Sequence, residues 1–292
     1  MRMLTFVVTV GLACAIFVDA LPATEINDVW PKLAPGETTR NRGETLPFRE
    51  NEKPRVTRVV KISRPTFTVH LAEQPNGAAA VILPGGGFGK VVPDKEGTEV
   101  AQWLNQQGIA AFVLSYRTTE DSSIPGWVKP LQDAQRMMAL VRSQAKLYGL
   151  KTDRIGLAGF SAGGQVAAKL LCDQGKLSYQ RIDEVDDVSH RPDFAMLIYP
   201  WRVYDTTTGS LIAGVNVSED VPPTFIVHTD DDASSSLGAV LFYAELKKLK
   251  IASELHVYGD GGHGYGLRKV SGSQISTWTD HAAHWLAKNA TK

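Results

Sequence analysis

A serine between glycines is the pattern in this chain best suited to covalent chemistry. Residues 159–164 read GFSAGG; they follow the apolar stretch 154–158 and open into a helical pattern that continues to residue 171. A G-x-S-x-G sequence between a strand and a helix is typical of a sharp turn that lifts the serine hydroxyl above a sheet edge. Gly159 and Gly163 would allow the close backbone contacts of such a turn. The pattern predicts Ser161 as the nucleophile of an acyl-transfer reaction, rather than a glycine-rich connection.

A second glycine run could stabilise the negative charge that develops in such a reaction. Residues 84–89 read PGGGFG and follow the apolar residues 78–83. With this kind of turn, the loop after the third strand and the residue after the nucleophile donate backbone N–H groups to the oxyanion. We expect these donors to be Gly86, Gly87 and Ala162. The run lacks the Lys-Ser/Thr of a P-loop and does not fit G-x-G-x-x-G, which argues against a phosphate-binding loop.

The serine also needs an imidazole base and a carboxylate that orients the imidazole, in the chain order serine, acid, histidine. His263 lies in the sequence GGHG at 261–264, after a predicted strand and before the last helix. The other histidines lie in strands, in the last helix or before the expected acid: His70, His190, His228, His256, His281 and His284. The acid is expected in the run of aspartates at 230–232, and position alone does not choose among the three.

Apolar and amphipathic stretches alternate from residue 56 onward. Strands are predicted at 56–62, 66–71, 78–83, 109–114, 154–160, 194–199, 224–228 and 253–258, and helices at 96–107, 131–148, 162–171, 237–248 and 274–288. Continuous apolar strands separated by helices indicate an α/β fold with a mostly parallel sheet and helices on both faces. No repeat or linker interrupts the pattern, so one domain is predicted over residues 55–292.

The first 54 residues have a different character. Arg2, an apolar run over 4–18 and the sequence VDA at 18–20 predict a signal peptide over residues 1–20, with an uncleaved anchor as the alternative. This predicts a secreted or periplasmic protein. Residues 21–54 are rich in Pro, Glu, Arg, Gly and Thr and predict an extended arm, lying on the domain or partly loose. After cleavage Cys172 would be the one remaining cysteine; it is expected to be a buried core residue, with no internal disulfide.

Composition narrows the choice of partners. Of the 292 residues, 31 are Lys or Arg and 31 are Asp or Glu, so the balance suggests neither nucleic-acid binding nor an anionic membrane surface. A small neutral substrate fits this balance better, and no stable membrane association is expected once the signal segment is removed. The sequence has no His-x-x-x-His or paired-cysteine motif, so neither a metal site nor an organic cofactor is expected.

At this point the sequence resembles a known family, the acetylxylan-esterase-like α/β-hydrolases, which are related to dienelactone hydrolases. The resemblance covers nearly all of the chain after the signal segment and rests on residues 28–31, 35–38, 83–88, 96–101, 112–117, 130–136, 159–164, 191–194 and 261–267. It implies Asp232 as the acid, four residues after His228, with Asp231 in reserve. The chain departs from the family at 233–236, where ASSS replaces Pro or Val followed by Glu-Asn-Ser.

The resemblance also implies a function: a serine esterase that removes short acyl groups, acetate above all, from xylan or xylo-oligosaccharides through an acyl-enzyme. The alternatives are a broader carboxylesterase or feruloyl esterase with the same triad, and a non-catalytic binding protein of the same fold. Phe88, Trp127, Trp201 and Tyr265 lie in loops expected near the site. They are candidates for stacking on sugar rings, with core packing as the equal alternative.

Overall fold

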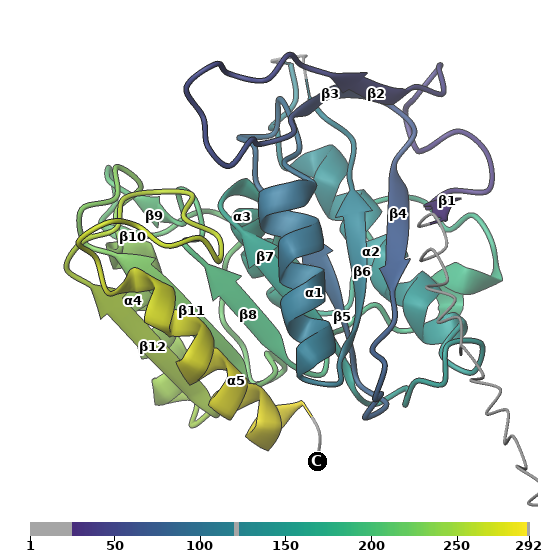
Figure 1. The fold of residues 1–292 in the computed structure, drawn as a ribbon. Coiled ribbons are helices and arrows are strands. Elements are labelled where there is room, and N and C mark those ends of the chain that lie inside the picture. The colour runs from purple at the N-terminus through teal and green to yellow at the C-terminus, as the bar shows by residue number, and fades with distance from the viewer. Residues whose placement is uncertain (1–24, 120–122, 291–292) are drawn as a thin grey trace, which may run out of the picture.

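The computed structural model describes residues 25–119 and 123–290, so the predicted signal peptide at 1–20 lies outside the described residues. At its centre is an eight-stranded sheet in the order β1-β4-β6-β5-β7-β8-β11-β12 (Figure 1). Neighbours from β6 to β12 pair in parallel, whereas β4 is antiparallel to both β6 and β1. The strands span Ile26–Asp28 (β1), Thr66–His70 (β4), Ala110–Ser115 (β6), Ala79–Leu83 (β5), Ile155–Phe160 (β7), Ala195–Ile198 (β8), Thr224–Thr229 (β11) and Ser253–Tyr258 (β12).

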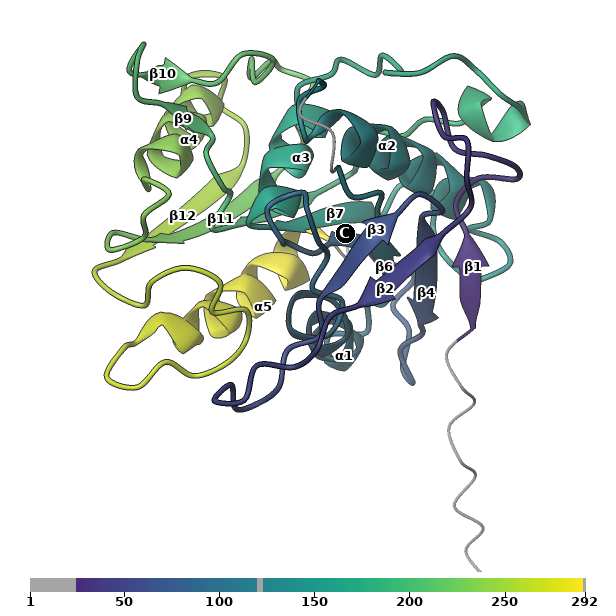
Figure 2. The same cartoon turned by 90° about the horizontal axis from the view of Figure 1, so that it is seen from above.

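Helices cover both faces of this sheet, which confirms the predicted fold class. Figure 2 shows α1 and α5 on one face and α2, α3 and α4 on the other. The helices span Glu99–Gln106 (α1), Val128–Ser143 (α2), Ala162–Leu171 (α3), Leu237–Lys248 (α4) and Trp278–Asn289 (α5), with short turns at Asp94–Thr98 (η1), Glu184–Asp187 (η2) and Ile275–Thr277 (η3). Strand side chains alternate between two cores: Val81 and Leu83 of β5 pack beside α2 and α3, and Ile82 packs beside α1.

Some boundaries differ from the prediction. The helix predicted at 131–148 begins earlier, at Val128, and ends at Ser143. The strands predicted at 56–62 and 66–71 lie in different sheets, because β3 (Val59–Ile62) pairs with β2 (Arg42–Thr45) in a separate two-stranded sheet. Four short strands were not predicted: β1, β2, and the pair β9 (Tyr204–Asp205) and β10 (Ser210–Leu211). They are two to four residues long and half exposed, so they carry no hydrophobic alternation of their own.

The described part of the N-terminal arm lies on the domain, one of the two arrangements left open by the sequence. β1 extends the edge of the main sheet, and the indole of Trp30 donates a hydrogen bond to Asp133 Oδ1 over 2.7 Å. Arg117 is fully buried; its guanidinium donates to Asp133 and, over 2.6 Å, to the carbonyl oxygen of Pro35. This buried ion pair joins Asp133 of helix α2 to Arg117, two residues after β6, and the bond to Pro35 attaches the arm to it.

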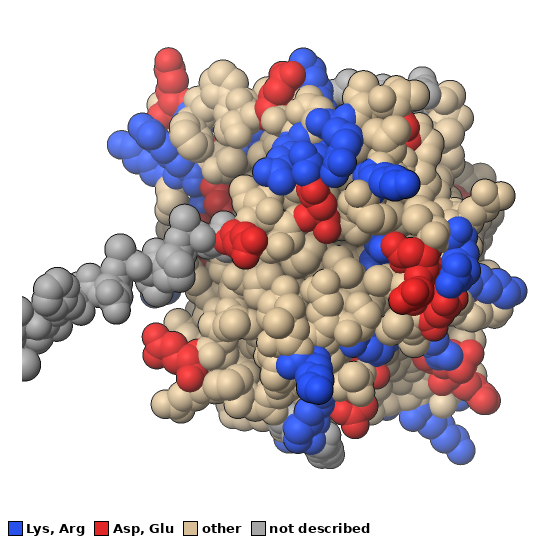
Figure 3. Space-filling model, turned by 90° about the vertical axis from the view of Figure 1, so that its right-hand side faces the viewer, with Lys and Arg blue, Asp and Glu red and all other residues tan. Residues whose placement is uncertain are grey.

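The surface carries charges of both signs. On the face shown in Figure 3, Lys and Arg side chains alternate with Asp and Glu side chains, in keeping with the equal totals in the sequence. Among the described residues, no helix combines the length and apolar character needed to cross a membrane.

Candidate active site

Ser161 occupies a strained turn between β7 and α3. β7 ends at Phe160 and α3 begins at Ala162, and the serine between them has φ 53° and ψ −118°, a region that residues with a side chain rarely adopt. A Cβ on Gly163 would lie 2.1 Å from the carbonyl oxygen of Leu83, and one on Gly159 would lie 2.5 Å from the carbonyl oxygen of Gly163. Only glycine fits at both positions, so the local sequence holds the serine at the carboxyl end of a central strand.

The structure brings the predicted nucleophile, base and acid into one hydrogen-bonded chain. Ser161 Oγ lies 2.7 Å from His263 Nε2, and His263 Nδ1 lies 2.5 Å from Asp232 Oδ2. The other carboxylate oxygen of Asp232 accepts a bond from the amide of Ser234 over 2.8 Å. These residues follow three parallel strands, β7, β11 and β12, whose carboxyl ends meet at one sheet edge. Such a chain can take a proton from the serine and stabilise the resulting imidazolium.

Asp231, the reserve acid, has a different set of contacts. Its carboxylate accepts hydrogen bonds from the amides of Gly262, over 2.9 Å, and Gly261, over 3.2 Å. The Gly262 bond, more than any other cause, lowers the pKa of this carboxyl below its usual value. Thr229 Oγ1 donates to the carbonyl oxygen of Gly262 over 2.7 Å. Asp231 thus contacts the backbone of the loop that presents His263.

His228 is packed in the interior, as expected for a strand end. It is fully buried, and burial lowers the pKa of its imidazole, so the neutral form is favoured. Its Nδ1 lies 3.9 Å from Asp232 Oδ2, beyond hydrogen-bond distance. His228 therefore packs near the acid without a hydrogen bond to it.

Ser161 and His263 open onto a cavity of about 400 Å³. Gly86 and Gly87, the predicted oxyanion donors, lie in its wall with φ values of 140° and 66°. A Cβ on Gly86 would lie 2.1 Å from the carbonyl oxygen of Lys90, so this position also requires glycine. Ala162, the third predicted donor, is the first residue of α3, where backbone N–H groups lack helical partners.

The N-terminal arm supplies part of this cavity. Arg49 and Glu52 line it together with Arg58, Lys90 and Lys95. Arg58 and Glu52 form a salt bridge of 2.6 Å. Arg49, Glu52, Arg58, Lys90 and Lys95 are not predicted as site residues from the sequence. Neither Arg49 nor Glu52 belongs to a motif, and only the path of the arm over the domain brings them to the cavity.

A buried carboxylate lies behind the glycine loop. Glu96 Oε2 accepts the amide N–H of Gly85 over 2.7 Å, and Oε1 accepts the hydroxyl of Tyr199 over 2.8 Å. The same hydroxyl accepts the amide N–H of Gly266 over 3.0 Å, and the Tyr199 ring packs edge-on against His263 at 5.1 Å. Burial raises the pKa of Glu96, although both hydrogen bonds lower it. Through the Tyr199 hydroxyl, Glu96 connects the glycine loop with the loop that carries His263. The sequence predicts only that Glu96 begins a helix, so this contact could not be predicted from it.

The four candidate aromatic residues lie in different environments. Trp201 lines the cavity, and Phe88 packs edge-on against it at 5.8 Å. Trp127 lies outside the described lining of this cavity, and the ammonium of Lys169 covers its ring at 4.0 Å. Tyr265 is only 3% exposed and belongs to the core beside α1 and α5. Tyr265 is therefore a core residue. Among the described residues that line this cavity, Trp201 is the aromatic one available to a ligand.

Cys172 ends helix α3 and is buried, as expected from its apolar surroundings. Burial raises the pKa of its thiol to about 12. A protonated thiol is a poor nucleophile, so this cysteine has a structural role.

Comparison with known proteins agrees with this architecture. Residues 68–196 match the family described as BD-FAE. The acetylxylan esterase of Xylanibacter ruminicola is 27% identical over 222 residues, which cover 68% of this chain and 43% of that protein. The endo-1,4-beta-xylanase B of Butyrivibrio fibrisolvens is 29% identical over 218 residues, covering 68% of this chain and 34% of that protein.

A solved structure is similar over almost its whole length. The acetyl ester-xyloside bifunctional hydrolase of Caldicellulosiruptor lactoaceticus has a TM-score of 0.69 and 28% identity, covering 94% of this chain and 99% of that one. The chain has the α/β-hydrolase fold, and these similarities support a relation to acetylxylan-esterase-like α/β-hydrolases. This α/β-hydrolase spans less than half the length of the two curated relatives. The BD-FAE match ends at residue 196, before Asp232 and His263, so the acid and base of this α/β-hydrolase lie beyond the matched region.

Proposed function

We propose that this protein is a serine esterase that hydrolyses acetyl and other short acyl esters on xylan or xylo-oligosaccharides. The observation that carries the proposal is the contact chain from Ser161 Oγ through His263 to Asp232, at the mouth of a cavity lined by Gly86 and Gly87. The substrate class is supported by similarity to proteins named acetylxylan esterase and acetyl ester-xyloside hydrolase.

In the first half-reaction Ser161 Oγ attacks the ester carbonyl carbon while His263 Nε2 takes the hydroxyl proton. Asp232 holds the imidazole in the tautomer with Nδ1 protonated and stabilises the imidazolium. The oxyanion of the tetrahedral intermediate accepts N–H groups from Gly86, Gly87 and Ala162. The intermediate collapses when the imidazolium gives its proton to the leaving sugar alcohol, which leaves the acyl group bound to Ser161.

In the second half-reaction water replaces the alcohol. His263 takes a proton from the water as its oxygen attacks the acyl carbonyl, and the same amides stabilise the second oxyanion. Collapse of this intermediate releases the carboxylic acid and returns the proton to Ser161 Oγ. The N-terminus of helix α3, which begins at Ala162, also stabilises the negative charge of the oxyanion through the helix dipole.

The test is acetate release from acetylated xylo-oligosaccharides by the purified protein and by Ser161→Ala, with p-nitrophenyl acetate as a simple ester. Release by the parent and not by the variant supports both the mechanism and the substrate class. Hydrolysis of the aryl ester alone would keep the serine mechanism and reject xylan as substrate. Activity on neither substrate would contradict the proposal as a whole.

Two alternatives are separated by the same assay. A broader carboxylesterase or a feruloyl esterase would use the same triad, and parallel reactions with feruloylated arabinoxylan and a series of aryl esters would identify it. A non-catalytic binding protein of this fold would form no acyl-enzyme. Mass spectrometry of protein quenched during turnover should detect Ser161 carrying an acetyl group, a result that excludes the binding protein.

We also propose that residues 1–20 direct export and are removed, and that residues 21–54 and 55–292 then work as one unit. Contact of Arg49 and Glu52 with the cavity supports the second part. N-terminal sequencing of the exported protein tests the first.

A further inference from the structure

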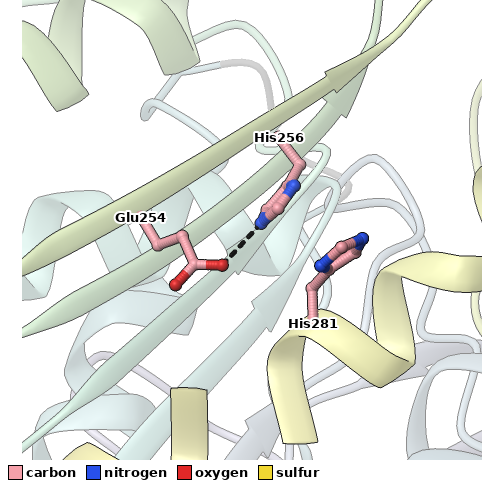
Figure 4. Close-up of side chains that lie close together, drawn as sticks. All are labelled: Glu254, His256 and His281. Atoms are coloured by element: carbon pink, nitrogen blue, oxygen red, sulfur yellow. Dashed lines mark hydrogen bonds and ion pairs between the residues drawn. The ribbon is translucent and has the colours of Figure 1, made fainter. Parts of the chain in front are cut away.

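Two histidines and a glutamate meet on the far strand of the sheet, away from the candidate active site. Glu254 and His256 lie two residues apart on β12 and so face the same side, where His281 of α5 covers them. His256 Nε2 lies 2.7 Å from Glu254 Oε1, and the rings of His256 and His281 stack with centroids 4.3 Å apart. One nitrogen or oxygen ligand atom from each residue lies within 4.8 Å of the others (Figure 4).

We propose that Glu254, His256 and His281 bind a divalent transition-metal ion, represented by Zn²⁺. Two imidazoles and one carboxylate suit zinc and its neighbours, whereas Ca²⁺ and Mg²⁺ prefer all-oxygen ligands. Zinc bonds of about 2.0–2.2 Å place tetrahedral ligand atoms about 3.4 Å apart. His256 Nε2 and Glu254 Oε1, 2.7 Å apart, are already closer than this, and all three ligand atoms lie within 4.8 Å of one another. Because the His256 and His281 rings are stacked, the exposed His281 side chain has to rotate so that one of its nitrogens faces the ion beside His256 and Glu254.

The other two ligands are already oriented. The His256 ring packs against Phe225, with centroids 5.4 Å apart, and its Nε2 is directed at Glu254 by their hydrogen bond. A metal ion can bind His256 Nε2 only when that nitrogen carries no proton, so metal binding would replace the hydrogen bond between His256 and Glu254. A proton on Nε2 would pass to solvent, and the bound neutral imidazole would carry its one N–H proton on Nδ1.

The position of the site suggests what the metal would do. β12 ends at Tyr258 and η3 begins at Ile275, so β12 and α5 flank the segment that carries His263. An ion bridging β12 and α5 would tie the two ends of that segment together. None of its three ligands lines the candidate active-site cavity among the described residues. We therefore expect the metal to raise thermal stability and to leave the basal activity unchanged.

The experiment uses tag-free protein stripped with a chelator and then titrated with Zn²⁺ in competition with a chromophoric chelator, with Ca²⁺ as the comparison ion. The parent should bind one Zn²⁺ at this site. His281→Ala should weaken that binding about 100-fold or more, because loss of even an outer-shell partner costs about 10- to 100-fold. At a free Zn²⁺ concentration about 100 times Kd, the Tm of the parent should rise by about 5 °C.

The matched control is His284→Ala, which removes another exposed imidazole one turn further along α5 and outside the cluster. It should bind Zn²⁺ and show the Tm shift as the parent does. His256→Asn should behave like His281→Ala, and the circular-dichroism spectra of all variants check that they are folded. Equal affinity in the parent and His281→Ala, equal loss in His284→Ala, or no Zn²⁺ binding by the parent would each overturn this ligand set. These readouts need no esterase activity, so they stand apart from the proposed function.

Discussion

Glu96 Oε2 lies 2.7 Å from the amide nitrogen of Gly85, directly behind the two glycines proposed as oxyanion donors. Glu96→Gln keeps the shape of the side chain but replaces one acceptor oxygen with an amide group that cannot accept the same bond. We expect kcat for p-nitrophenyl acetate to fall about 10- to 100-fold with little change in KM, because the loop shifts where the transition state needs it. Glu73→Gln, at an exposed position, is the control. An unchanged kcat in Glu96→Gln would contradict this positioning role.

The same variant should change how stability depends on pH. Burial raises the pKa of Glu96 above its ordinary value of 4.5, so the unfolded chain loses this proton at lower pH than the folded protein does. The cost of ionising the buried group is therefore absent below pH 4.5 and grows as pH rises through 4.5 toward the folded-state pKa. Thermal melts from pH 4 to pH 8 should show the Tm of the parent falling relative to that of Glu96→Gln. A constant difference across this range would show that Glu96 does not titrate there.

Asp232 and Asp231 can be separated by matched substitutions. Asp232→Asn should lower kcat about 10⁴-fold, since the amide favours the wrong tautomer of His263. Asp231→Asn should cost about tenfold or less, because Asp231 contacts only the backbone of the histidine loop. Steady-state kinetics on p-nitrophenyl acetate measures both. The opposite order of effects would assign the acid to Asp231.

Trp201 is expected to contact the sugar part of the substrate. Trp201→Ala should raise KM for acetylated xylo-oligosaccharides about tenfold, corresponding to loss of about 1.4 kcal/mol of aromatic contact, and should affect p-nitrophenyl acetate less. Tyr265→Phe is the comparison: it keeps the buried ring and removes a hydroxyl that has no hydrogen-bond partner among the described residues. It should leave both KM values unchanged. Equal effects of Trp201→Ala on the two substrates would argue against sugar stacking.

Cys172 should resist alkylation in the folded protein. A thiol pKa of about 12 leaves almost no thiolate at pH 8, and burial restricts access of the reagent. Iodoacetamide should therefore modify Cys172 only after denaturation, as measured by peptide mass spectrometry at that residue. Native esterase activity should survive the treatment. Rapid modification of Cys172 with loss of activity would contradict a structural role for this cysteine.

Local patterns in the sequence were sufficient for much of the framework. The alternation of apolar strands and amphipathic helices predicted the mostly parallel sheet, and helices α3 and α4 and strand β12 have the predicted bounds. The short strands β1 and β2 were missed, because strands of three and four residues are defined by their partners rather than by their own sequence. Each long helix or strand has a hydrophobic periodicity of its own, so its type can be predicted from the sequence alone.

The candidate site was likewise predicted in part from the sequence, and the rest required the tertiary structure. Ser161 and His263 were nominated from glycine-flanked sequences, since a sharp turn at a strand end leaves a local signature. Their separation of 2.7 Å, the choice of Asp232 over Asp231 beside the imidazole, and the contact of Glu96 with the glycine loop depend on the tertiary structure. The positions of the arm residues at the cavity and of the proposed metal ligands on β12 and α5 also depend on the tertiary structure. These side chains come from separate segments of the sequence, and only strand pairing and helix packing bring the segments together, so no local pattern predicts the contact between them.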